Sequence, residues 1–276
     1  MKRTQIIVIS VAALLIVLLF ILPKSKPAVE TKQVAVKEEK SDDIKTHVDA
    51  IISQLDSASL SITEKIKKDY ALETDRGKKT ALLDSLIAIW DFYGKPLVSA
   101  YYSEQKLELI GDDKILKEVA DRYFFSTNHA DDHLKSHLFE KAEVFYIRFL
   151  EKDSTDIEAK INLAVCYVES SKDPMRGIGL LKEVLEKDPD NIKAHLNLGY
   201  FSIKSGQFDK AIDRFEKVLK IDPKHNEALL YLGDVYESKG ELPKAIENYE
   251  RYKASLTDKA VALEVQSYIQ KLKNKL

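Results

Sequence analysis

Residues 192–225 read IKAHLNLGYFSIKSGQFDKAIDRFEKVLKIDPKH, and residues 226–259 repeat the same pattern as NEALLYLGDVYESKGELPKAIENYERYKASLTDK. The pair Leu198-Gly199 returns thirty-four positions later as Leu232-Gly233. Further matches at the same offset are Gly206 with Gly240, Ala211 with Ala245, and Phe215 with Tyr249. Such a fixed period indicates a repeated helical unit, because each unit buries its apolar side only by stacking on its neighbours.

Each unit has the features of two antiparallel helices joined by a tight turn. Helices cross closely only where small residues meet, so we expect Gly199 to face Ala211. The next unit would pair Gly233 with Ala245 in the same way. Gly206 suits the left-handed conformation that ends a helix, since glycine carries no side chain to oppose it. The pattern therefore predicts helix, turn and helix in every copy.

Copies of the unit continue upstream. Leu163-Ala164, Gly177 and Asp188-Pro189 repeat the pattern with one extra residue, and Ala164 is expected to face Gly177. An earlier second helix is marked by Ala142, Tyr146 and Phe149. At least three copies in succession favour a stack of helix pairs.

Composition supports a helical chain and excludes several function classes. The 276 residues are 45% hydrophobic and 32% charged and include only nine glycines and seven prolines, which disfavours a turn-rich sheet protein. Forty-three basic residues nearly balance forty-five acidic ones, so we expect no nucleic-acid partner. The single cysteine, Cys166, lies in an apolar run and is predicted to be a small core residue.

Residues 157–191, 192–225 and 226–259 resemble repeats of the tetratricopeptide repeat (TPR) family, with Leu-Gly, Gly, Ala, an aromatic residue and Asp-Pro in the family's spacing. The resemblance implies an all-α fold, a right-handed superhelix of antiparallel helix pairs. Two departures from the family pattern are Ser202, where an aromatic residue is preferred, and His195, where a bulky apolar one is. These departures are expected to weaken packing only locally.

The remaining chain divides by the same patterns. TPR repeats are expected over 114–258, the first with a long insertion from Thr127 to Ser136, and a degenerate repeat over 80–110 lies within a helical region, 46–113. A capping helix is expected over 259–276, because a terminal repeat must cover its apolar end. Its predicted apolar stripe consists of Val261, Leu263, Val265, Tyr268, Ile269, Leu272 and Leu276.

The amino terminus has the features of a membrane anchor. Residues 1–23 combine a short basic tail with the uncharged run Ile6–Leu22, just long enough to span a bilayer. No small-x-small cleavage pattern follows, which favours an uncleaved anchor, and residues 24–45 resemble a solvated flexible linker.

The order of these segments resembles TPR proteins of bacterial inner membranes that carry one amino-terminal span. This resemblance implies a single-pass protein with its TPR domain on the periplasmic side, acting on an envelope or translocon complex. The basic residues flanking the span on both sides leave a cytoplasm-facing TPR adaptor as an alternative.

TPR superhelices bind peptides on a concave face formed by the first helices of successive repeats. Projected onto this chain, the resemblance implies a groove for another protein or peptide, with membrane-tethered scaffolding in envelope protein assembly, secretion or quality control as the function. The groove would be lined by Ile161, Asn162, Val165, Glu169, Lys193, Leu196, Asn197, Tyr200, Ile203, Lys204, Leu230, Tyr231 and Asp234.

An alternative of another class is a metal-binding protein or enzyme that uses His129, His133 and His137. Imidazoles four residues apart lie on one helical face, although the same residues also suit a solvated helix start. The chain has no glycine-rich phosphate loop, no Gly-x-Ser-x-Gly elbow and no His-Glu-x-x-His helix. We therefore expect no enzyme activity, no catalytic residue, no cofactor, no metal and no small-molecule substrate.

Deleting residues 1–23 should release the protein from membranes, because no other apolar run approaches the length that a bilayer requires. Alkaline carbonate extraction of cell membranes measures this. Retention of the shortened chain in the carbonate-resistant fraction would contradict the single anchor.

Overall fold

The computed structural model describes residues 41–170 and 173–276, and within these ranges it contains thirteen α-helices, two short 3-10 helices and no strand. The α-helices are α2 (Ser41–Ser53), α3 (Ser57–Leu72), α4 (Arg76–Phe92), α5 (Pro96–Ile110), α6 (Leu116–Ser126), α7 (Asp132–Lys152), α8 (Ile157–Glu169), α9 (Pro174–Lys187), α10 (Ile192–Lys204), α11 (Phe208–Ile221), α12 (Asn226–Ser238), α13 (Leu242–Ser255) and α14 (Lys259–Lys273). The 3-10 helices are η2 (Asp113–Ile115) and η3 (Thr127–His129).

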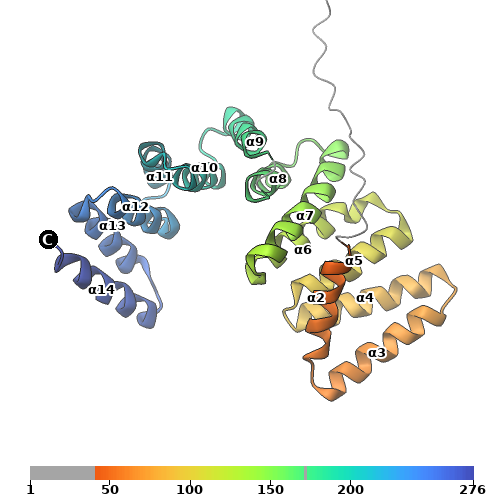
Figure 1. The fold of residues 1–276 in the computed structure, drawn as a ribbon. Coiled ribbons are helices and arrows are strands. Elements are labelled where there is room, and N and C mark those ends of the chain that lie inside the picture. The colour runs from red at the N-terminus through yellow and green to blue at the C-terminus, as the bar shows by residue number, and fades with distance from the viewer. Residues whose placement is uncertain (1–40, 171–172) are drawn as a thin grey trace, which may run out of the picture. The chain divides into compact units, whose positions relative to one another are not determined.

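Helices adjacent in the chain pack against each other in pairs, as Figure 1 shows. The pairs are α4 with α5, α6 with α7, α8 with α9, α10 with α11, and α12 with α13. Helix α14 then packs on α13. The predicted all-α, TPR-like arrangement is confirmed for the described residues.

The amino-terminal boundaries differ from the sequence analysis at one point. Helix α2 begins at Ser41, so the predicted linker boundary at residue 45 falls inside a helix. The predicted anchor Ile6–Leu22 lies outside the described residues. Among the helices of the described ranges, none has both the length and the apolar character needed to cross a bilayer.

The expected insertion from Thr127 to Ser136 is much shorter in the structure. Helix α7 already begins at Asp132, because the side chain of Asp131 accepts a hydrogen bond from the backbone N–H of Leu134 at 2.9 Å and caps the helix. Only η3 and two residues separate α6 from α7.

The first helices of the three clearest repeats begin at matching capping residues. Asp156, Asn191 and His225 each accept a hydrogen bond from the N–H three residues ahead. Gly206 and Gly240 have φ values of 70° and 76°, which confirms the predicted left-handed turns after α10 and α12. Cap and turn together fix where each helix pair starts and reverses.

The helix crossings of the later repeats place an aromatic ring directly over a glycine. A Cβ atom on Gly199 would lie 2.5 Å from the Phe215 ring, and one on Gly233 would lie 2.5 Å from the Tyr249 ring. The predicted partners Ala211 and Ala245 are fully buried one helical turn before these aromatic residues, and their contact with the glycines stays a prediction. The nearest atoms over each glycine belong to the aromatic ring.

The predicted contact between Ala164 and Gly177 is confirmed. A Cβ atom on Gly177 would overlap the carbonyl oxygen of Ala164, so the backbones of α8 and α9 touch directly at this point. Gly179, two residues further along α9, has open space around it.

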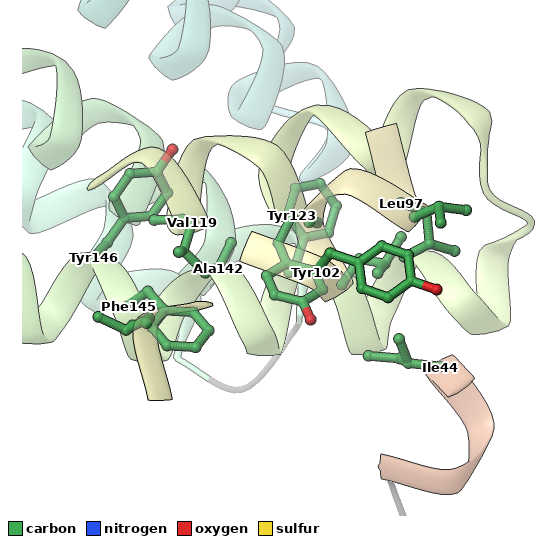
Figure 2. Close-up of a cluster of buried hydrophobic side chains, with 14 of the residues drawn as sticks. Ile44, Leu97, Tyr102, Val119, Tyr123, Ala142, Phe145 and Tyr146 are labelled. Atoms are coloured by element: carbon green, nitrogen blue, oxygen red, sulfur yellow. The ribbon is translucent and has the colours of Figure 1, made fainter. Parts of the chain in front are cut away.

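The largest buried cluster joins the amino-terminal helices to the first repeats, and Figure 2 shows part of it. It extends from Ile44 on α2 to Tyr167 on α8, and the rings of Tyr123 and Phe145 stack within it at 6.0 Å. Helices α2 to α8 therefore share one core. Cys166 belongs to it, as predicted, and burial raises the pKa of its thiol well above the ordinary value.

The capping helix buries a narrower stripe than the sequence predicts. Ile269 and Leu272 are fully buried in the core of the last repeats, and Val265 packs against it. Val261, Leu263, Tyr268 and Leu276 are exposed, so their predicted place in the stripe was wrong. The buried contact uses only one narrow side of α14.

His195 is buried and fully paired. Its Nε2 lies 2.9 Å from the carbonyl oxygen of Pro189, to which it donates, so Nδ1 accepts from the Arg214 guanidinium at 3.3 Å. Burial lowers the pKa of His195, and the charges of Arg214 and Lys217 act in the same direction, against the carbonyl of Pro189 and the carboxylate of Asp190. The ring is therefore held in its neutral form.

Replacing Gly177 by Ala should destabilise the protein by about 1–3 kcal/mol, because the new methyl group meets backbone that cannot rotate away. Gly179→Ala on the same helix should instead stabilise it by about 0.5–1 kcal/mol, since space is open and alanine favours a helix. Thermal unfolding of the full chain followed by circular dichroism measures both. Equal changes in stability for the two substitutions would show that the close approach of α8 and α9 does not restrict the residue at position 177.

The stability of the protein should fall as the pH decreases through about 6.5, the ordinary pKa of histidine in an unfolded chain. His195 has a lowered pKa in the folded state, so the unfolded chain takes up the proton first. His195→Gln, whose amide can still donate to Pro189, should reduce this loss in thermal melts at pH 7.5 and 5.5 (about one unit either side of that pKa). The exposed histidine His129, changed to Gln, is the control, and an unchanged pH dependence in His195→Gln would refute the assignment.

Candidate functional site

The first helices α8, α10 and α12 lie side by side and form one surface, which we call the first-helix face. Two ion pairs connect α10 to α8 across this face. Lys193 Nζ lies 2.9 Å from Glu158 Oε1, and Lys204 Nζ lies 3.0 Å from Glu169 Oε2. Both pairs join residues thirty-five positions apart, so the repeat period places them in register.

A hollow of about 280 Å³ opens on this face between α10 and α12. Its walls bring together five of the residues predicted from the sequence and one that was not predicted. They are Lys193, Leu196, Asn197, Tyr200 and Tyr231, with Glu227.

Two tyrosines dominate the hollow. The ring centroids of Tyr200 and Tyr231 are 6.0 Å apart, and both side chains are half-buried. The Tyr231 ring also packs on Phe215 at 5.2 Å, which ties it to the core beneath. Lys204 lies over the Tyr200 ring at 5.7 Å. Tyr200 and Tyr231 therefore present an ordered aromatic surface to solvent.

The carboxylate of Glu227 shapes the chemistry of this surface. Burial raises the pKa of Tyr231 to about 12, and the negative charge of Glu227 one turn earlier acts in the same direction. The phenol stays protonated at neutral pH and donates a hydrogen bond to the Glu227 carboxylate. Asn197 is already engaged, because its amide donates to the Lys193 carbonyl at 2.8 Å.

Four of the predicted groove residues pack within the helix stack. Ile161 is only 3% exposed and belongs to the core between α8 and α10. Val165 packs against the same core, and Ile203 and Leu230 pack against the core of the later repeats. None of these four side chains lines the hollow between α10 and α12.

The other predicted residues are held by polar contacts. Glu169 and Lys204 pair with each other, as described above. The Asn162 amide donates to the Tyr146 hydroxyl at 3.0 Å, and that hydroxyl donates to Asp121 at 2.6 Å. Asp234 accepts from the Tyr249 hydroxyl at 2.6 Å. Whether any of them contacts a ligand stays a prediction.

The sequence analysis missed Glu227 and Glu158, although the signal for both was present. Each is the second residue after a helix cap, the position that Lys193 occupies in α10. Alignment of the three repeats therefore gives Glu, Lys and Glu at one site. Lys193 was included by projecting the family's concave face onto the first helices, and its counterparts could have been found by the same offset.

Acidic groups collect at the carboxyl-terminal end of α12. Glu237 accepts hydrogen bonds from Tyr268 at 2.8 Å and from Tyr249 at 3.2 Å, next to Asp234. Its hydrogen bond and burial together raise the pKa of Tyr268 to about 12. Lys275 is 3.9 Å away from Glu237, at the limit of an ion pair.

A second hollow, of about 200 Å³, lies among the amino-terminal helices. Glu104 accepts there from the Tyr123 hydroxyl and pairs with Lys141 at 2.7 Å. Burial and Glu104 raise the pKa of Tyr123. These groups satisfy one another at the edge of the buried cluster, so we assign them a structural role.

The histidines of the metal alternative lie at the start of α7. His129 is exposed on η3, and the rings of His133 and His137 are 4.7 Å apart on the first turns of α7. Within the described ranges, no three histidine, cysteine, aspartate or glutamate side chains come together as a metal site would require.

Comparison with protein families identifies the repeats. Two family models, both described as Tetratricopeptide repeat, match residues 170–214 and 203–260. These residues carry TPR repeats. No curated protein matches the chain in sequence.

Solved structures confirm the fold. PilW, described as a widely conserved type IV pilus biogenesis factor, has a TM-score of 0.50 and 16% identity over 72% of this chain and 94% of its own. PilF of Pseudomonas aeruginosa has a TM-score of 0.50 and 17% identity over 72% and 86%. MamA has a TM-score of 0.48 and 20% identity over 65% and 92%. At these identities, PilW and PilF show a shared fold and nothing about partners.

Proposed function

We propose that this protein is a scaffold that binds a segment of another protein on its first-helix face, at the hollow between α10 and α12. The observation that carries the proposal is the pair of half-buried tyrosines, Tyr200 and Tyr231, held 6.0 Å apart beside charged side chains. Tyrosine supplies a large contact area at low entropic cost and is enriched where proteins bind most strongly.

The distribution of polar groups supports a peptide as ligand. Lys193 and Glu227 stand at the rims of the hollow, and the Tyr231 phenol donates to the Glu227 carboxylate at neutral pH. Such a surface combines an apolar floor with polar edges, which is how protein segments are held and oriented.

We further propose that residues 1–23 anchor the scaffold in a bacterial inner membrane, with the repeats in the periplasm. The support is the uncharged run Ile6–Leu22 behind a short basic tail. Fusion of the carboxyl terminus to a reporter that is active only after export separates this orientation from the cytoplasm-facing adaptor.

Site-specific photo-crosslinking in cells tests the binding surface. A photo-reactive residue placed at Asn197, on the rim of the hollow, should crosslink a partner, and the same residue at Glu247, exposed on the second helix α13, should not. Adding Tyr200→Ala and Tyr231→Ala should lower the crosslink yield at position 197 by about tenfold or more.

Thermal melts of the same variants control for folding. Tyr231 contacts Phe215, so Tyr200→Ala alone is the second variant if the double variant melts early. Equal crosslinking from positions 197 and 247, or an undiminished yield in a folded tyrosine variant, would refute the proposed surface.

A further inference from the structure

Charged residues occupy the same position in each first helix of the first-helix face. The second residue after each helix cap is Glu158 in α8, Lys193 in α10 and Glu227 in α12. Lys193 forms an ion pair with Glu158 of the preceding repeat at 2.9 Å. Glu158 also lies 3.7 Å from Lys117, which pairs with Asp121 at 2.8 Å, so two cations and two anions balance on this side.

The position in α14 that corresponds to Lys193 carries no cation. Helix α14 follows α12 and α13 and has its own cap at Asp258, and the second residue after that cap, which corresponds to Lys193, is Ala260. Lys259 directly follows the cap, but no ion pair between described residues includes Glu227. The Glu227 carboxylate stands at the rim of the hollow, where it is the hydrogen-bond partner of the Tyr231 hydroxyl.

The acidic excess extends along α12. Lys204 is neutralised by Glu169 at 3.0 Å. Asp234 and Glu237 lie further along α12, and Lys275 approaches only Glu237, at 3.9 Å. Glu227 is therefore the acidic group on the α12 side of the hollow, whereas the charged side chains that connect α10 to α8 pair with each other.

We propose that the hollow between α10 and α12 receives an arginine side chain of the bound protein segment, with its guanidinium against Tyr200 and Tyr231 and paired with the Glu227 carboxylate. This inference rests on the proposed function and specifies the chemistry of the ligand. The partner's arginine then supplies the cation that pairs with Glu227.

Guanidinium fits the observed groups better than ammonium does. It is planar, so it stacks on a tyrosine face while its N–H groups point outward in a fork that a carboxylate accepts. The tyrosine pair offers such a face, and Glu227 lies on the same helix as Tyr231, one turn before it. A hollow of about 280 Å³ suits a long side chain rather than a folded element.

Selection from a random peptide library displayed on phage, with the full chain in detergent micelles as the target, tests the inference. Peptides recovered on the wild-type protein should be enriched in arginine by about fivefold over the starting library. Glu227→Lys should abolish this enrichment. Glu247→Lys, which makes the same charge change on the exposed side of α13 in the same repeat, should keep it.

Fluorescence anisotropy then measures one selected peptide and its citrulline analogue, which has the same shape without the charge. The wild-type protein should bind the citrulline peptide about fivefold more weakly, and Glu227→Gln should bind both within about twofold. Circular dichroism melts confirm that the variants fold.

The outcomes separate the two proposals. If peptides are recovered that need Tyr200 and Tyr231 but show no arginine preference, the binding surface stands and the arginine inference is overturned. An arginine preference that survives Glu227→Lys overturns it as well. If no peptide is recovered on the wild-type protein, both the proposed function and the inference are contradicted.

Discussion

The contact of an aromatic ring with a glycine on the facing helix sets the geometry on which the later repeats depend. Phe215 fills the space over Gly199, and any Cβ atom there would overlap the ring. The same ring supports Tyr231 of the next repeat at 5.2 Å, and Tyr231 in turn faces Tyr200 at 6.0 Å. One small residue thus determines the spacing of two helices and the position of the aromatic surface. The contact between Phe215 and Tyr231 therefore links the core to the proposed binding surface, because Phe215 is buried and Tyr231 lines the hollow.

Local signals in the sequence were sufficient for much of the fold. The period of thirty-four residues, the capping residues and the glycines with left-handed φ each act within a few residues, so they could be read directly. Contacts that depend on the rotation of one helix against another were predicted only in part. The contact of Ala164 with Gly177 is confirmed and the Phe215 ring over Gly199 was not predicted, while Leu263 of α14 is exposed although Ile269 and Leu272 are buried.

The same distinction explains the outcome for the candidate site. First-helix positions could be identified from the repeat, but a helix divides its residues between packing and exposure according to neighbours that sequence does not show. Ile161 is buried for this reason, whereas Tyr200 lines the hollow. Glu227 could have been identified from the sequence alone, since its position in α12 matches that of Lys193 in α10. What the sequence lacked was the observation that Lys193 is already paired and Glu227 is not.

The most direct test of the binding surface is hydroxyl-radical footprinting of the full chain with and without its bound partner, because radicals modify exposed side chains. Binding at the first-helix face predicts that modification of Tyr200 and Tyr231 decreases, while Phe92, which is 85% exposed on α4, is modified as before. Protection of Phe92 with unchanged modification of the two tyrosines would contradict the account and place the partner on the amino-terminal helices.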